Sequence, residues 1–168
     1  GQLTKIGQRI FSEVVAEGEQ AVTVGWTTVP FNDPDEPVVT VLSWLLDNDT
    51  SGLLNLELEL SQKVPDASAS TSNSHESGYL TVKATAREGQ PLEEVEKLLL
   101  DTVEKLKSGK ITQQDIDAIV LANDIRRKMQ YESTDGRVYK MMESFVYRQT
   151  WPKMLERDER LRKVTRED

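Results

Sequence analysis

Residues 78–130 read GYLTVKATAREGQPLEEVEKLLLDTVEKLKSGKITQQDIDAIVLANDIRRKMQ, and the periodicity of this stretch decides the fold. Over 78–86 apolar and polar side chains alternate, which predicts a strand with one face toward a core. Over 92–106 apolar residues recur at spacings of three and four, which predicts an amphipathic helix. A second helix of this kind is predicted over 112–130. The stretch is therefore expected to form one strand and two helices.

The ends of these two helices carry sequence signals. Gln90 is expected to cap the first helix, with Pro91 at a position where a helix needs no N–H. Gly109 is expected to end that helix in the left-handed conformation. Thr112, with Asp115 three residues later, predicts a capping box at the start of the second helix.

The chain upstream of this stretch adds further strands and helices. Strands are predicted over 21–29 and 64–71, and a helix is predicted over 38–46. Residues 53–62 fit either a strand or a helix, and their glutamates and leucines favour the helix. The polar residues 72–77 are expected to join two strands as a hairpin.

The chain downstream is expected to be helical. A break over 131–136 precedes helices predicted over 138–146 and from Trp151 onward, and Thr165 is expected to cap a further helix. The whole order predicts an α+β fold: a split βαβ (ferredoxin-like) antiparallel or mixed sheet, with helices packed on one face and additional C-terminal helices. No linker divides the sequence, so residues 1–168 are expected to form a single domain.

The composition excludes several classes of function. The chain has a formal net charge of −8, whereas a nucleic-acid-binding protein needs a basic surface, so no nucleic acid is expected as a partner. No apolar run approaches the ~18 residues of a membrane span. Cysteine is absent, which excludes disulfides, thiol nucleophiles and cysteine metal ligands.

The residues offer no catalytic apparatus. His75 is the single histidine, so neither H-E-x-x-H nor H-x-x-E-H can be completed, and a serine triad would lack any other imidazole as its base. His75 is interpreted as a solvated residue of the hairpin. Paired carboxylates such as Glu57 and Glu59 are interpreted as surface charge. No catalytic, cofactor-binding or metal-ligating residue is therefore assigned to this chain.

A collinear series of short phrases runs along almost the whole chain. It consists of GEQAVTVGW (18–26), DEPVVTVLSWLL (35–46), SGLLNLEL (51–58), GYLTV (78–82), LLLDTVEKLKS (98–108), GKIT (109–112), YES (131–133) and VTRED (164–168). In this order and spacing the phrases resemble a domain of the insulinase/pitrilysin-type zinc metallopeptidases, the inverzincins. In that family two homologous α+β halves close around an extended peptide. One half carries H-x-x-E-H and a downstream glutamate, and the other half is catalytically silent.

The resemblance implies the role of the silent half, because this sequence lacks H-x-x-E-H. Such a half would wall the substrate chamber and bind the peptide backbone by strand addition, while zinc is held in the catalytic half. The expected partners are that catalytic half, on the same precursor or a separate subunit, and a peptide substrate. The chain would then be cut from a longer zinc metalloendopeptidase and be inactive alone. Similar bacterial proteins suggest the periplasm or cell envelope.

Three residues are expected to face the substrate, namely Tyr79, Thr81 and Arg87. Silent halves of this family often place an arginine and a tyrosine on or after the strand matching 78–86, although their order here differs. An arginine that many members carry after the first helix is replaced by the run SGLL at 51–54. Two alternatives stay open. One is a structural or assembly domain derived from such peptidases with no proteolytic role, and the other is an unrelated ferredoxin-like module that binds a small ligand on its sheet.

Overall fold

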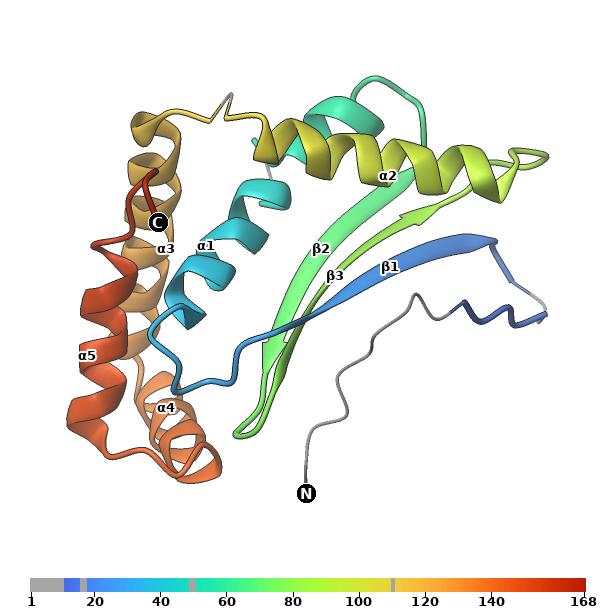
Figure 1. The fold of residues 1–168 in the computed structure, drawn as a ribbon. Helices are drawn as coiled ribbons and strands as arrows, with labels where there is room; N and C mark the ends of the chain where they lie inside the picture. Colours follow the sequence, from blue (N-terminus) through green and yellow to red (C-terminus); the bar gives the residue numbers. More distant parts are fainter. Residues whose placement is uncertain (1–10, 16–17, 49–50, 110) are drawn as a thin grey trace.

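The computed structural model of the chain describes residues 11–15, 18–48, 51–109 and 111–168. Within these residues a three-stranded sheet is combined with helices that precede and follow its hairpin (Figure 1). The elements are β1 (Ala21–Thr28), α1 (Glu36–Leu46), the short π-helix η1 (Asn55–Glu59), β2 (Asp66–Asn73), β3 (Gly78–Thr85), α2 (Leu92–Lys107), α3 (Gln113–Glu132), α4 (Thr134–Val146) and α5 (Trp151–Leu161). The predicted α+β fold is confirmed.

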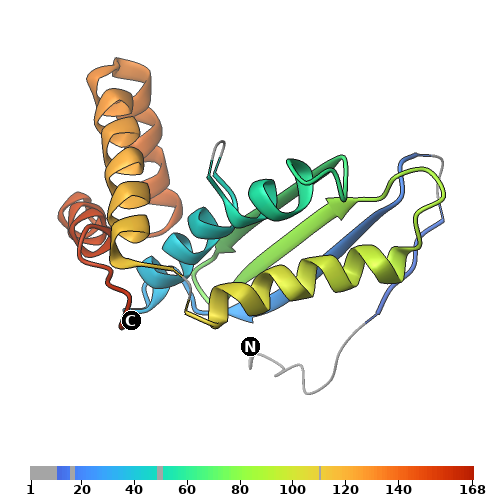
Figure 2. The same cartoon turned by 90° about the horizontal axis from the view of Figure 1, so that it is seen from above.

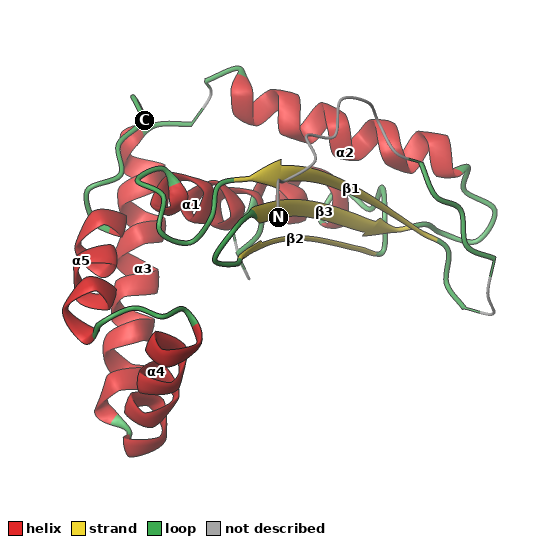
Figure 3. Cartoon of the chain, turned by 60° about the horizontal axis from the view of Figure 1, so that its bottom comes forward, coloured by secondary structure: helices red, strands yellow, loops and turns green. Residues whose placement is uncertain are grey.

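The sheet has the strand order β1-β3-β2, and Figure 3 shows the three strands side by side. β3 pairs antiparallel with both neighbours, so β1 and β2 run parallel to each other on either side of it. This is the split βαβ arrangement, in which α1 and η1 connect the two parallel strands. Of the predicted antiparallel or mixed sheet, the antiparallel form is the one observed.

The hydrogen-bond register of β1 follows from one bond at its start. The N–H of Ala86 donates to the carbonyl oxygen of Gln20 at 2.7 Å. Hydrogen-bonded pairs recur at every second position of an antiparallel ladder. The N–H and C=O groups that point away from β3, along the outer edge of β1, therefore belong to Ala21, Thr23, Gly25 and Thr27.

One face of the sheet packs against α2, α1 and η1. Val82 and Ala84 of β3 are fully buried there, against Val95 and Leu99 of α2. The other buried members of this first hydrophobic cluster are Leu46, Leu54, Leu58, Val64, Ala67 and Ala86. On the opposite face, no helix within the described ranges covers the strands (Figure 3). By the alternation of side chains along the strands, threonines, serines, Tyr79 and Lys83 lie on that face.

A second hydrophobic cluster joins α1 to the C-terminal helices. It contains Val41, Leu45, Ile116, Ile119, Val120, Leu161 and Val164. Figure 2 shows α3, α4 and α5 gathered beyond α1, away from the sheet. The second cluster therefore attaches the C-terminal helices to the βαβ unit. The predicted additional C-terminal helices are confirmed.

A buried ion pair reinforces this attachment. The Glu36 carboxylate is 1% exposed and accepts two hydrogen bonds from Arg157 of α5, at 2.7 Å from Nε and 2.6 Å from Nη2. Thr40 and Asn73 donate to the same carboxylate at 2.7 and 3.0 Å. The Arg157 guanidinium also lies over the ring of Phe31, 5.0 Å from its centroid. One carboxylate thus connects α1, β2 and α5.

Two of the predicted helix signals are confirmed. Gly109 has a φ of 74° and follows the end of α2 as a left-handed cap. Thr112 and Asp115 form the capping box of α3, and the hydrogen bonds from Thr112 lower the pKa of the Asp115 carboxyl. The break predicted over 131–136 is shorter than expected. Only Ser133 separates α3 from α4, because its hydroxyl accepts the N–H of Gly136 and starts the new helix.

Several predicted boundaries differ from the structure: the helix predicted over 38–46 begins at Glu36, the helix predicted over 138–146 begins at Thr134, and the strand predicted over 64–71 spans Asp66–Asn73. β2 begins at Asp66 instead of residue 64, because the N–H of Val64 bonds back to the carbonyl of Leu58 behind η1. The N-cap of α2 is Pro91 instead of Gln90.

The Gln90 side chain closes the preceding turn instead of capping the helix. Its oxygen accepts the N–H of Arg87 at 3.1 Å, and its nitrogen donates to Glu94 at 3.1 Å. Residues 53–59 are helical, as their composition favoured. None of the helices in the described part of the chain combines the length and hydrophobicity that a bilayer crossing requires.

Candidate functional site

Two carboxylates occupy the first part of the outer edge of β2. Glu59 Oε1 accepts the backbone N–H of Ala67 at 2.8 Å, and Asp47 Oδ2 accepts that of Ala69 at 2.9 Å. Asp47 directly follows α1 and Glu59 ends η1, so each of the two helices delivers one acceptor to the strand. An additional strand could not reach these two N–H groups without displacing the carboxylates.

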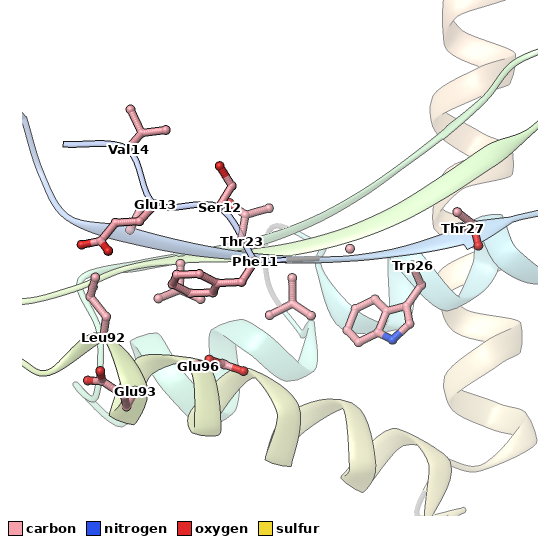
Figure 4. A pocket seen from close by; sticks show the side chains of 14 residues that line it. Phe11, Ser12, Glu13, Val14, Thr23, Trp26, Thr27, Leu92, Glu93 and Glu96 are labelled. Carbon is pink, nitrogen blue, oxygen red and sulfur yellow. The ribbon is translucent and has the colours of Figure 1, made fainter. Parts of the chain in front are cut away.

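The outer edge of β1 is open along a groove of about 550 Å³. Residues 21–27 of β1 form its floor, residues 11–14 lie along one side, and α2 contributes Leu92, Glu93 and Glu96 to the other (Figure 4). The N–H and C=O groups that leave β1 on this side point toward the groove. The two edges of the sheet therefore differ: carboxylates occupy two N–H groups of the β2 edge, whereas the β1 edge faces a groove.

The groove combines unpaired strand backbone with a partly apolar wall. Figure 4 shows Leu92 and Phe11 on its α2 side, together with the carboxylates of Glu93 and Glu96. An extended peptide that adds to a sheet edge bonds to the strand backbone and places alternate side chains on the two faces of the sheet. The geometry of β1 supports this mode of binding.

The structure places two of the three predicted substrate-facing residues together. Tyr79 and Thr81 share the helix-free face of β3, where Tyr79 is 51% exposed and Thr81 contacts the hydroxyl of Ser70 at 3.0 Å. Arg87 lies beyond the far end of the strand, in the turn before α2. Eight residues of extended chain separate two such positions by about 26 Å, so Arg87 does not join Tyr79 in one site.

The described residues do not fit a zinc site. No group of three or more histidine, cysteine, aspartate or glutamate residues is close enough to hold a metal ion among them. His75, the single imidazole of the chain, is exposed in the connection between β2 and β3. A catalytic zinc site usually takes two or three imidazole ligands. This donor set cannot supply them.

The residues that distinguish the two edges cannot be recognised from the sequence. Glu59, which the sequence places among the surface charges, accepts a hydrogen bond from the backbone of β2. Asp47 directly follows α1, and the sequence carries no signal of its role. The sequence around a carboxylate that follows a helix does not indicate which distant strand will donate a hydrogen bond to it. The contact across 22 residues, from Asp47 to Ala69, becomes visible only in three dimensions.

Comparisons with known proteins assign the family. The sequence matches the family described as the peptidase M16 inactive domain over residues 2–123. None of the curated proteins matches the chain.

Three solved structures show the same fold. A protease from Helicobacter pylori is 20% identical with a TM-score of 0.81, over 88% of this chain and 36% of that one. The inactive peptidase domain of a candidate zinc protease from Bordetella parapertussis is 15% identical with a TM-score of 0.74, over 92% and 85% of the two chains. A peptidase M16 inactive domain from Pseudomonas fluorescens is 13% identical with a TM-score of 0.73, over 88% and 35%.

The present chain covers different fractions of the lengths of the matched chains. The chain spans about a third of the Helicobacter and Pseudomonas chains, at 36% and 35%, and most of the Bordetella domain. The family match covers well over half of the present sequence. The suspected resemblance is thus confirmed, and the chain belongs to the family of peptidase M16 inactive domains.

Proposed function

We propose that the chain is the non-catalytic half of a zinc-dependent metallopeptidase, which walls the substrate chamber and binds an extended peptide on the edge of β1. The observation that carries this proposal is the contrast between the two edges of the sheet. Carboxylates of Asp47 and Glu59 occupy two N–H groups of the β2 edge, whereas the edge of β1 faces a groove of about 550 Å³.

The catalytic zinc would belong to a homologous partner half, on the same precursor or on a separate subunit. Membership of the inactive-domain family supports this division of labour. Among the described residues, no group of three or more histidines, cysteines, aspartates or glutamates could hold a metal ion. The chain would form one domain of that longer enzyme, in the periplasm or cell envelope, and hold the peptide backbone while the partner half cuts it.

If a peptide adds to β1 as a strand, the register of β1 predicts which peptide N–H groups form hydrogen bonds with it. The edge groups belong to Ala21, Thr23, Gly25 and Thr27, whose side chains lie on the helix-free face. Residues directly opposite each other in a sheet share a face. In an octapeptide of alternating valine and serine, the valines should turn toward α2 and the serines toward the helix-free face. The serine N–H groups should then bond to β1.

Binding of three labelled octapeptides to the chain tests this geometry by fluorescence anisotropy. The unmodified peptide and a peptide N-methylated at the valines should bind alike. N-methylation at the serines should weaken binding at least about tenfold, because each lost backbone bond contributes about 0.5–1.5 kcal/mol. Equal binding of the two methylated peptides would contradict strand addition at β1.

The assigned inactivity has its own test. The chain should not cleave a quenched peptide in the presence of zinc, whereas a mixture with the H-x-x-E-H half should do so. Chelator-sensitive cleavage by the chain alone would refute the proposal. If the chain leaves cleavage by the catalytic half unchanged, a structural or assembly role becomes the better description.

A further inference from the structure

The groove at the β1 edge is lined by a segment of the chain itself. Residues 11–15, here called the edge segment, run beside β1 but are not part of a strand. Three of its five side chains are large and apolar, and Phe11 is 75% exposed. The edge segment thus leaves apolar side chains in water next to unpaired strand backbone, although its side chains suit a sheet.

The side chains of the edge segment already alternate as in a strand. Figure 4 shows Ser12 and Val14 on one side of the segment and Phe11 and Glu13 on the other, toward α2. Thr23 of β1 faces away from α2, on the same side as Ser12. Directly opposite residues in a sheet place their side chains on the same face. The edge segment can therefore pair with β1 with Ser12 opposite Thr23, without rotating about its own axis.

We propose that the resident occupant of the β1 edge is the edge segment, which pairs with β1 as a fourth strand with Ser12 opposite Thr23. In this register Val15 lies opposite Gln20, where the ladder of β1 with β3 begins. Gly18 lies between Val15 and Gln20, and its φ of 150° is one that favours glycine.

The pairing has a consequence for peptide binding, and this consequence rests on the proposed function. The N–H and C=O of Thr23 can bond either to Ser12 or to a peptide, but not to both. The edge segment therefore competes with the substrate for β1. Its release opens the groove, and its return closes it.

A disulfide tests the register directly, because the sequence contains no cysteine. The variant Ser12→Cys/Thr23→Cys should form a disulfide on mild oxidation, since opposite residues of a hydrogen-bonded pair are about 5.5 Å apart at their Cα atoms. Ser70→Cys/Thr81→Cys is the matched control, because these residues are opposite each other in β2 and β3 and their hydroxyls are 3.0 Å apart. A disulfide in the control alone would overturn the proposed register.

Two proline variants test the pairing in a second way. Ser12→Pro removes an N–H that would bond to Thr23, whereas Glu13→Pro removes one that would point away from β1. Amide hydrogen exchange at Thr23 should accelerate at least about tenfold in Ser12→Pro and stay unchanged in Glu13→Pro. Val24, which bonds to β3, should stay protected in both variants. Fast exchange at Thr23 in the unmodified chain would refute the pairing.

The same variants separate this inference from the proposed function. The oxidised Ser12→Cys/Thr23→Cys variant should lose binding of the valine–serine octapeptide and regain it on reduction, and Ser12→Pro should bind it more tightly. If the disulfide forms and no variant binds the peptide, the pairing stands and the peptide-binding role falls. If the peptide binds equally to the oxidised and reduced forms, the edge segment does not compete.

Discussion

Asp47 Oδ2 accepts a hydrogen bond of 2.9 Å from the backbone N–H of Ala69, and this contact joins the end of α1 to the outer edge of β2. The N–H would otherwise point out of the sheet. Glu59 performs the same task for Ala67. Unpaired strand edges recruit further strands, so these two carboxylates determine which side of the sheet can accept one.

Replacement of Asp47 by alanine is expected to lower the free energy of unfolding by about 1–3 kcal/mol, because the N–H of Ala69 loses its acceptor. The released edge should also promote self-association. Urea denaturation and light scattering measure the two effects. Asp66→Ala, at an exposed carboxylate of the same strand, is the control. Indistinguishable behaviour of the two variants would argue against a protective role for Asp47.

The ion pair between Glu36 and Arg157 should show strong coupling in a double-mutant cycle. Glu36→Leu or Arg157→Met alone should cost about 3–5 kcal/mol, because each leaves a buried partner without its counter-charge. The combination Glu36→Leu/Arg157→Met should recover much of this loss, since well-packed apolar side chains can replace a buried pair. Thermal unfolding of the variants gives the coupling. Simple addition of the single losses would contradict it.

The stability of the chain should fall in acid partly through Asp124. Hydrogen bonds from Arg162, Lys128 and Arg127 hold the pKa of this carboxyl well below the usual range of an aspartate. Because the pKa is depressed in the folded state, the stabilisation is fully present above pH ~4 and is lost as the pH falls further.

Denaturation of the unmodified chain and of Asp124→Asn between pH 6 and pH 2 measures this contribution. The stability difference between the two should be largest near neutral pH and shrink below pH ~4. A difference that stays constant over this range would show that the three cations do not act through the Asp124 charge.

Gly78 in β3 should tolerate a side chain far less well than Gly25 in β1. A Cβ at this position would lie 2.4 Å from the carbonyl oxygen of Val29 and 2.5 Å from the side-chain oxygen of Asn73. Gly78→Ala is therefore expected to cost about 3 kcal/mol through local overpacking. Gly25→Ala is the matched control in β1, since its Cβ meets no atom closer than 3.5 Å. Circular dichroism melts compare them, and equal losses would refute the steric argument.

Most of the architecture could be predicted from local patterns. The alternation over 78–86 and the helical spacing over 92–106 report which side of an element faces a core, and the structure buries those sides. The capping box of Thr112 and the left-handed Gly109 are also local, because the interacting groups lie within a few residues. Such features need no knowledge of the remaining chain.

The candidate site could not be predicted in the same way. Its floor is the edge of β1, and whether a strand lies at an edge depends on the pairing of all strands. Which of the two edges is the candidate site also depends on Asp47 and Glu59, because they accept hydrogen bonds from the backbone of β2, which lies elsewhere in the sequence. Tyr79 and Thr81 were chosen from a family resemblance, and a role for them in substrate contact stays a prediction.

Helix α1 contributes buried side chains to both hydrophobic clusters. α1 gives Leu46 to the cluster beneath the sheet, and Val41 and Leu45 to the cluster with α3 and α5. If either the sheet or the C-terminal helices unfolded alone, apolar side chains of α1 would be exposed to water. The chain should consequently unfold in one cooperative step. Truncation of the C-terminal helices should not give a smaller stable protein, because it would expose the apolar side chains of α1 that pack against them.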